Sequence, residues 1–449
     1  MDIGKKQKKI ISKAKEYIFS ISKNYNSQLS SYCYLGIIDK TPGWSKIKLI
    51  EKGWSFLPKY LLVLIKHVIA VGYLNDYFLY GSQIPNSKKK TLIISWSFKK
   101  NFSSDGSFND RYLNENTKNH KDIQWILISM DNYSPKKIND NIIIIKKKNN
   151  KLKFSILFFL KSFINNLIKN KFSLKKSLHY FSSHSIQALN FTNIIIKNLN
   201  IDNFSKILVP YESQPFQNYL FFKLKKIKKN ITTIGYVHSM LPSLPTNYIF
   251  RKGSPDILLV HGKNQKIILN KFLGWATKKI KIIQSLRYRK NSNRILSNKI
   301  FLPYGILNLN QYIIKFEKFL KYSKDFSLPN FEILNHPTQT NSKKHLLFKK
   351  KISNIIEDYE DKFNKNSKKK LSICFGWTAA VIEILEKNIE VIHICSDPVT
   401  ESFSKEIWPN IEIKKIDNYV LKYKLQSHSK YINFGKNKNL LKDCLKNIK

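Results

Sequence analysis

The chain has 449 residues, 42% of them hydrophobic, and only 14 glycines and 14 prolines, which excludes a disordered or collagen-like protein and suggests two or three domains. Its 79 basic and 30 acidic residues give a formal net charge of +49, yet only five of the basic residues are arginines. Nucleic-acid readers depend on the arginine fork, so this lysine-dominated charge reflects AT-rich coding DNA and fits an anionic membrane surface or substrate better than nucleic acid.

Residues 1–84 are expected to be a mainly helical N-terminal extension. The opening residues, MDIGKKQKKIISKAKEY, are basic and lack the apolar core of a secretory signal. The four cysteines are scattered and form no CxxC pair, so the sequence signals neither a disulfide framework nor a zinc site. We therefore expect a cytoplasmic protein, able to lie peripherally at the inner face of the membrane, that uses no metal or cofactor.

Short apolar runs follow this extension and alternate with helical patterns. This alternation is typical of α/β domains with a parallel sheet, whose strands are buried on both faces. Seven runs are predicted as strands, at 91–97, 123–129, 142–146, 206–210, 232–237, 256–260 and 279–283. We expect them to form a Rossmann-like domain over residues 85–290.

A second series predicts another Rossmann-like domain over residues 299–435. Its strands are expected at 299–303, 331–335, 371–375 and 391–395, and its helices at Leu309–Lys321, Ser342–Phe363 and Thr378–Lys387. The polar segment Arg289–Asn298 has no strand pattern and is predicted to link the two domains. Residues 436–449 are expected to form a basic tail that ends in a helix.

The segment Phe154–Ile168 has a wide apolar face flanked by lysines. A basic amphipathic helix of this kind can lie in a membrane interface. Helices of this composition more often pack on a sheet, so we favour core packing and keep the membrane as the alternative.

Several catalytic signatures are absent from the sequence. It contains no GxGxxG after a strand, no P-loop, no GxSxG elbow and no DxD motif at a strand end. The sequence therefore gives no support for dehydrogenase-type dinucleotide binding, NTPase activity or serine hydrolase activity.

The segment FEILNHPT ends a predicted strand in a polar loop that carries His336, Pro337 and Thr338. Ligands of open α/β sheets bind at the carboxyl ends of strands. Pro337 restricts the loop, and His336 can donate a hydrogen bond to a phosphate oxygen. An ordinary loop histidine is the alternative.

The segment 371–398 is expected to form a strand, a tight turn, a helix and a second strand. Gly376 permits the turn, Trp377 and Thr378 open the helix, and a helix start can bind a phosphate. Glu383 lies one turn into the helix, where it can reach a ribose hydroxyl or remain a surface residue. The next strand delivers Ser396 and Asp397 to the same edge.

These residues resemble the donor half of GT-B glycosyltransferases, above all bacterial surface-carbohydrate enzymes of the sialyltransferase-like and Kdo-transferase-like groups. The matching positions are the His-Pro pair at 336–337 and the turn from Ser372 to Thr378. The resemblance implies an α/β GT-B fold with two Rossmann-like domains around a central cleft. It also implies a nucleotide-sugar co-substrate whose phosphate lies between these two motifs.

The same resemblance places the acceptor and the catalytic base on the first domain. Asp105-Gly106 is similar to the family's acidic-Gly motif, which makes Asp105 the first candidate for the base. The segments YESQP and GYVHS also look similar to the family and offer Glu212 and His238 as further candidates, with Gln214 and Ser239 beside them. Glycosyl transfer requires such a proton acceptor at the sugar hydroxyl.

The sequence thus predicts a metal-independent glycosyltransferase of bacterial surface polysaccharide biosynthesis, the class that builds capsule or lipopolysaccharide. Its partners would be a nucleotide-sugar, a glycan or lipid-linked glycan acceptor, and an anionic membrane surface. Two alternatives stay open: a non-hydrolysing nucleotide-sugar 2-epimerase of the same architecture, and a non-catalytic membrane-associated binding subunit.

Overall fold

The computed structural model describes most of the chain. The described residues are 2–24, 28–36, 41–74, 76–81, 90–148, 153–289, 295–322, 327–336, 339, 342–364, 367–426, 431–436 and 440–448. Two of the predicted donor residues, Pro337 and Thr338, and the centre of the predicted linker, 290–294, lie outside these ranges.

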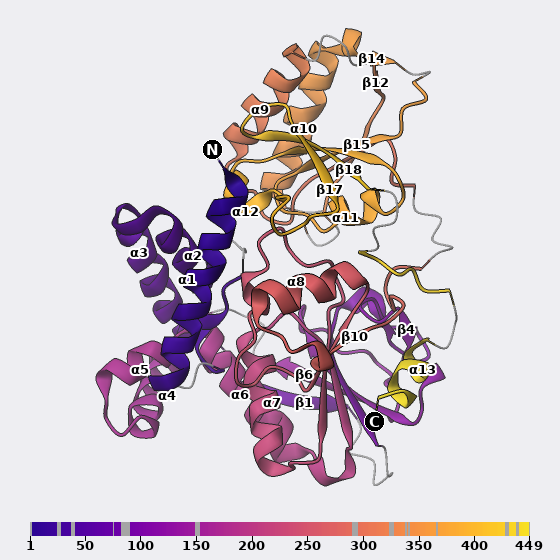
Figure 1. Ribbon diagram of the computed structural model, residues 1–449. Coiled ribbons are helices and arrows are strands. Elements are labelled where there is room, and N and C mark those ends of the chain that lie inside the picture. The colour runs from indigo at the N-terminus through magenta and orange to yellow at the C-terminus, as the bar shows by residue number, and fades with distance from the viewer. Residues whose placement is uncertain are drawn as a thin grey trace.

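The first half of the chain builds an eight-stranded sheet (Figure 1). In spatial order its strands are β1 (Tyr77–Gly81), β6 (Ile142–Lys147), β5 (Ile123–Ser129), β2 (Thr91–Ser97), β7 (Lys206–Pro210), β8 (Thr232–Tyr236), β9 (Ile257–Val260) and β10 (Ile280–Ile282). All pairs are parallel except β1 with β6. The seven predicted strands are confirmed, while the aromatic edge strand β1 was not predicted.

The second half builds a six-stranded sheet. In spatial order its strands are β13 (Glu332–Leu334), β11 (Lys299–Phe301), β15 (Leu371–Phe375), β16 (Glu390–Ile394), β18 (Val420–Leu425) and β17 (Ile411–Lys415). The first four strands are parallel and were predicted, whereas the antiparallel pair β17–β18 was not. The strands β10 and β11 belong to different sheets, and the expected α/β class with two Rossmann-like domains is confirmed.

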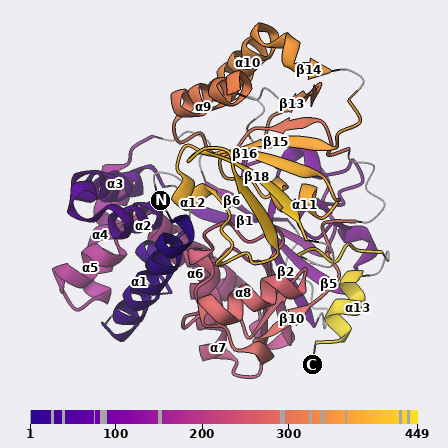
Figure 2. The same ribbon diagram turned by 45° about the horizontal axis from the view of Figure 1, so that its top comes forward.

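Helices cover the faces of both sheets, and the remaining strands form short ribbons (Figures 1 and 2). The helices are α1 (Ile3–Asn24), α2 (Pro42–Lys52), α3 (Leu57–Ile69), α4 (Ile156–Lys169), α5 (Leu174–Tyr180), α6 (Ser183–Asn198), α7 (Pro215–Ile227), α8 (Lys263–Leu273), α9 (Leu309–Tyr322), α10 (Lys343–Asp358), α11 (Ala380–Leu385), α12 (Pro398–Glu401) and α13 (Leu440–Lys446). The ribbons pair β3 (Asn109–Asp110) with β4 (Glu115–Asn116), and β12 (Leu328–Pro329) with β14 (Phe363–Asn364).

The N-terminal extension contacts both domains. In Figure 1, α1 runs beside α8 of the first domain and reaches α12 of the second. The Gln7 amide donates to the carbonyls of Val399 at 2.9 Å and Ser402 at 2.8 Å, and Thr246 Oγ1 donates to the Leu35 carbonyl at 2.6 Å. Because these are buried bonds, the extension holds the two domains in one arrangement.

The C-terminal segment returns to the first domain. Its backbone bonds to the loops after β9 and β10, since Asn433 N donates to His261 O at 2.8 Å and Ser285 N donates to Asn433 O at 2.7 Å. The helix α13 then buries Leu441 and Leu445 against the first sheet, with Trp125 in the same apolar cluster. The predicted basic tail is therefore part of the first domain's core.

The helix α4 agrees with the favoured sequence interpretation only in part. Phe158, Phe159 and Phe163 pack against a small apolar cluster that contains Phe181, as core packing predicts. The cluster lies among helices and not on a sheet. On another face of the helix, Leu157 keeps 79% and Ile156 67% of its surface exposed.

Candidate functional site

Three neighbouring strands of the first sheet end in ionisable side chains. Glu212 follows β7, His238 follows β8 and His261 follows β9. The Glu212 carboxylate lies 3.3 Å from His238 Nε2 through Oε1, and its Oε2 accepts a hydrogen bond from the Gln214 amide at 2.7 Å. The predicted residues Glu212, Gln214 and His238 therefore lie together, and the half-buried Ser239 follows His238 in the loop after β8.

The loop that carries Glu212 is rigidly braced. Ser213 adopts a left-handed conformation with φ of 62°, which a non-glycine residue keeps only under tertiary constraint. The buried Arg251 supplies that constraint, since its Nη2 donates to the Ser213 carbonyl at 2.9 Å and hydroxyl at 2.6 Å. The Glu212 amide donates to Gln217 Oε1 at 3.0 Å, and Asn247 Nδ2 donates to the Glu212 carbonyl at 3.0 Å.

Burial sets the protonation of this pair. It raises the pKa of Glu212, although the Gln214 hydrogen bond and the charges of Arg287 and Arg111 partly oppose the rise. It lowers the pKa of His238 well below the ordinary value, so this imidazole is neutral at physiological pH. A neutral imidazole donates one N–H to Glu212, while the carboxylate keeps 34% of its side-chain surface exposed and can reach a substrate.

Sequence reasoning missed two arginines at this site. Arg287 is exposed, and it acts electrostatically on Glu212 and His238 together with Arg111. The Tyr236 hydroxyl accepts from the backbone N–H of Arg287 at 3.2 Å and so positions it. Arginine is rare in this lysine-rich chain, so its occurrence at these positions was an available signal.

The second domain brings aromatic side chains to the same place. Tyr304 follows β11, His336 follows β13 and Trp377 follows β15, and all three are half-buried. The Tyr304 ring lies 5.1 Å from that of His336 and 6.5 Å from that of Trp377. Glu212 of the first domain acts electrostatically on Tyr304 of the second, so these two strand-end residues lie near each other across the domain boundary. We use the name interdomain site for one set of residues: Glu212, His238, Arg111, Arg287, Tyr304, His336 and Trp377.

The turn after β15 forms as predicted, but the helix behind it begins later. Gly376 has φ of 53°, and its carbonyl accepts from His393 Nε2 at 2.6 Å. Thr378 lies before α11, which starts at Ala380, and Thr378 Oγ1 accepts the Ala380 N–H at 3.2 Å. That amide is therefore not available to a phosphate, and α11 is too short to supply a strong dipole.

The other predicted donor residues have structural partners. Glu383 is buried in the first turn of α11 and acts electrostatically on Arg287 across the domain boundary. Glu401 accepts the amide hydrogens of Ser396 at 2.6 Å and Asp397 at 3.1 Å, and Lys48 of α2 pairs with the Asp397 carboxylate. These bonds fix the loop after β16 and tie it to the N-terminal extension.

Ser372 was also predicted to bind the donor, but it lies away from the ligand-binding end of its strand. It lies near the amino end of β15, is fully buried, and donates its hydroxyl to the Leu296 carbonyl at 2.6 Å. The turn predicted to hold a phosphate is formed at the opposite end of the strand. We therefore leave Ser372 out of the donor site.

Asp105 lies in an exposed turn of the first domain. Its carboxylate accepts the Ser107 amide at 3.0 Å and hydroxyl at 2.7 Å, and it pairs with Lys118 at 3.2 Å. These contacts, with Ser107 first, lower the pKa of Asp105 to about 2. Gly106 has φ of 84°, and a Cβ there would lie 2.9 Å from the Ile138 backbone nitrogen. The Asp-Gly pair thus has a complete structural role, and a carboxylate of such low pKa is a weak base.

Replacing Gly376 with alanine is expected to destabilise the protein by about 2–4 kcal/mol, because the backbone is left-handed and the new Cβ would enter the Tyr312 hydroxyl. An ideal Cβ at this position lies 2.2 Å from that oxygen. Gly305→Ala is the matched control, since a Cβ there meets nothing within 4 Å. Denaturant unfolding measures both variants, and equal stability would show that the turn relaxes.

Comparisons with known proteins find similarity in structure and not in sequence. No protein-family model and no curated protein matches the sequence. The fold is similar to a solved structure titled as a glycosyltransferase from Rickettsia africae, with 14% identity and a TM-score of 0.33 over 70% of this chain and 86% of that chain. At this distance, functional assignments depend on the chain's own residues.

Proposed function

We propose that this protein is a GT-B glycosyltransferase that moves a sugar from a nucleotide-sugar donor to an acceptor hydroxyl. The observation that carries the proposal is the interdomain site. There a half-exposed carboxylate of raised pKa, Glu212, faces aromatic and cationic groups at the carboxyl edges of two Rossmann-like sheets. Such edges are the ligand-binding positions of open α/β sheets.

Glu212 is the proposed base, in place of the first sequence candidate Asp105. It accepts the proton of the acceptor hydroxyl while the acceptor oxygen bonds to the anomeric carbon and the bond from that carbon to the donor phosphate breaks. His238 is a positioning residue, since it is buried and reaches the reaction only through its contact with Glu212 at 3.3 Å. The raised pKa suits a general base, because it lies closer to the operating pH.

Arg287 and Arg111 are the proposed partners of the donor phosphate. Their guanidinium groups can neutralise the departing phosphate through paired hydrogen bonds, which makes a metal unnecessary. His336, beside Tyr304, can donate a further bond. Tyr304 and Trp377 offer ring faces to the nucleotide base.

The biological setting is proposed from the motifs alone. The His-Pro pair at 336–337 and the segments YESQP and GYVHS resemble bacterial surface-carbohydrate enzymes. They support an acceptor that is a growing or lipid-linked glycan, in capsule or lipopolysaccharide synthesis at the inner face of the membrane.

Nucleotide binding tests the proposal directly. In a thermal-shift panel of uridine, cytidine, guanosine and adenosine nucleotides with a chelator present, one class should stabilise the protein by about 2.7 kcal/mol at 100 times its Kd. The His336→Ala variant should lose about 1.5–3 kcal/mol of that affinity, roughly 10- to 150-fold, as a charge-assisted hydrogen bond is lost.

Glu332→Ala is the matched control, since Glu332 lies at the other end of β13. Equal affinity in both variants would remove His336 from the donor site. If the bound nucleotide-sugar is consumed without any acceptor and yields an epimer, the protein is an epimerase. If it binds and no acceptor leads to turnover, the protein is a binding subunit.

A further inference from the structure

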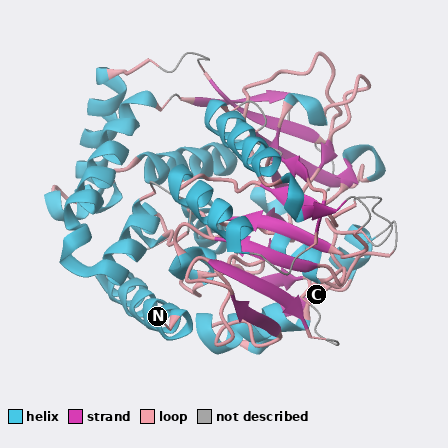
Figure 3. Ribbon diagram, turned by 90° about the horizontal axis from the view of Figure 1, so that it is seen from above, coloured by secondary structure: helices cyan, strands magenta, loops and turns pink. Residues whose placement is uncertain are grey.

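We infer that the outward faces of α3, α4 and α5 form a docking surface for an anionic lipid bilayer. The three helices lie together on one flank of the molecule, away from the strands of both sheets (Figures 1 and 3). This inference does not depend on the proposed donor or acceptor. We call the exposed apolar side chains of these helices the apolar flank.

The helix α4 differs from an ordinary surface helix, whose exposed face is polar. Its inner face packs Phe158, Phe159 and Phe163 against the protein. Leu157, Leu160 and Ile164 recur at three- and four-residue spacing on its outer face, with exposed fractions of 79%, 48% and 52%. An apolar face that a folded protein exposes over this length marks an interaction site.

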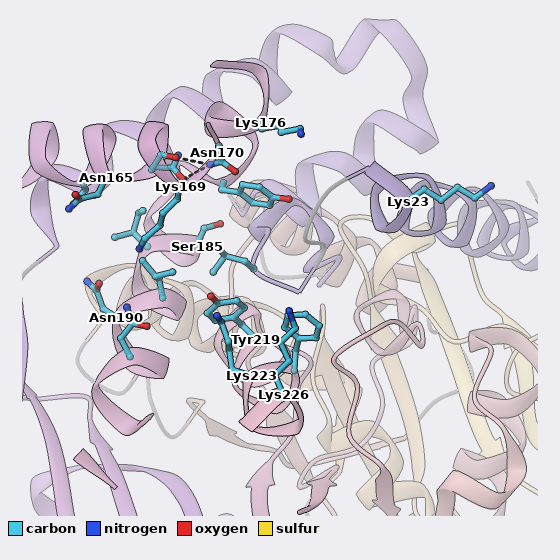
Figure 4. Close-up of a pocket in the computed structure, with 18 residues that line it drawn as sticks. Lys23, Asn165, Lys169, Asn170, Lys176, Ser185, Asn190, Tyr219, Lys223 and Lys226 are labelled. Carbon is cyan, nitrogen blue, oxygen red and sulfur yellow. Dashed lines mark hydrogen bonds between the residues drawn. The ribbon is translucent and has the colours of Figure 1, made fainter. Parts of the chain in front are cut away.

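The rotation of α4 about its axis is fixed by buried contacts. The buried Asn166 amide donates to the Ser177 carbonyl at 2.6 Å and accepts from Asn170 at 3.0 Å. Beside Asn166, the helix lines a cavity of about 670 Å³ together with Asn190 of α6 and Lys223 of α7 (Figure 4). Turning α4 over would break these hydrogen bonds and expose its packed phenylalanines, so the leucine face stays outside.

The helices α3 and α5 extend the same surface. No residue of α3 is buried, and its Leu62, Ile65 and Ile69 are about half exposed, at 51%, 55% and 48%. The Tyr73 ring that follows α3 lies 5.2 Å from the Phe154 ring that precedes α4, so the two apolar faces are continuous. Tyrosine and tryptophan favour the level of the lipid headgroups.

The charges around the apolar flank select an anionic partner. Residues 52–74 and 153–180 contain nine lysines and no aspartate or glutamate. Each basic residue near an anionic membrane contributes about 1 kcal/mol of attraction. A second copy of this chain is the less favourable occupant, since a symmetric dimer would bring two lysine-rich faces together with no acidic partner.

The geometry favours helices that lie in the membrane interface over a spanning helix. The helical stretch Pro42–Tyr73 has a window of mean hydropathy 1.5, long and apolar enough to cross a membrane by length and composition. Gly53, at φ of 67°, separates α2 from α3, and α2 buries Ile47 in the protein. The 13-residue α3 is only about 20 Å long, shorter than a hydrocarbon core of about 30 Å.

Vesicle co-sedimentation of the full chain tests the inference. The protein should bind vesicles of phosphatidylcholine with phosphatidylglycerol, bind less as salt is raised, and bind pure phosphatidylcholine weakly. The double variant Leu157→Glu with Ile164→Glu should lose at least about tenfold in binding, since two apolar anchors become charged. The matched control is Ile314→Glu with Leu347→Glu, two exposed apolar residues of the second domain, which should bind like the wild type.

Four outcomes would overturn the inference. The first two are that the protein does not bind anionic vesicles, or that the control variant loses as much binding as the α4 variant. The third is that the bound protein resists carbonate extraction, as a spanning helix does. The fourth is that the wild type is a dimer and that the α4 substitutions dissociate it. Unchanged nucleotide-induced thermal shifts in the α4 variant would show that it is folded. Failure here would leave the proposed glycosyl transfer untouched, because that is measured with a soluble acceptor.

Discussion

The Glu212→Gln variant is expected to lose about 10²–10⁴-fold in turnover while its nucleotide affinity stays within a factor of two or so. Glutamine keeps the shape and can still accept one hydrogen bond, but it cannot take the proton of the acceptor hydroxyl. The comparison of kcat with an acceptor against nucleotide Kd separates these effects. Loss of nucleotide binding in step with turnover would contradict a role as base.

Asp105→Asn is the matched control for this prediction. The Asp105 carboxylate is hydrogen-bonded within its own β-turn and has a pKa of about 2, so it is a weak base. This variant should therefore keep nearly the wild-type kcat. The reverse result, with Asp105→Asn inactive and Glu212→Gln active, would assign the role of base to Asp105.

The pH profile of turnover gives a second check on Glu212. Turnover should fall as pH drops through the raised pKa of Glu212, which lies above the ordinary carboxyl value of about 4.3.

Substituting Arg287 should cause the second-largest loss. Arg287→Ala is expected to lower kcat/KM by about 10²–10³-fold, as an electrostatic partner of the departing phosphate is removed. Arg287→Lys keeps the charge but not the planar fork, so it should recover only part of this loss. Steady-state kinetics with varied donor measures both variants.

Arg289→Lys is the matched control for Arg287→Lys, because it makes the same change of side chain at a nearby position. Arg289 lies two residues away and pairs with Glu115 at 3.3 Å, a contact that lysine can keep. It should therefore leave kcat/KM close to the wild-type value. If Arg287→Lys and Arg289→Lys behave alike, Arg287 does not bind the donor phosphate through its fork.

The parallel strands could be predicted from the sequence, whereas the antiparallel edge could not. Runs such as 91–97 and 371–375 carry only apolar residues and small serines at their buried positions, since both faces of a parallel strand are covered. The strand β18, VLKYKL, alternates Lys422 and Lys424 with apolar residues, and β17, IEIKK, ends in two lysines. In a chain with this much lysine, such alternation does not stand out from the background composition.

The sequence by itself determined the fold class, the strand ends and the glycine turn at 376, because burial pattern and backbone sterics are local properties of the chain. It also brought Glu212 and His238 to notice as strand-end residues. Only the tertiary structure decided that these two side chains meet, that Arg287 lies near them, and that α4 leaves one apolar face exposed. These features arise where segments distant in the chain pack together, and a local pattern carries no information about that packing.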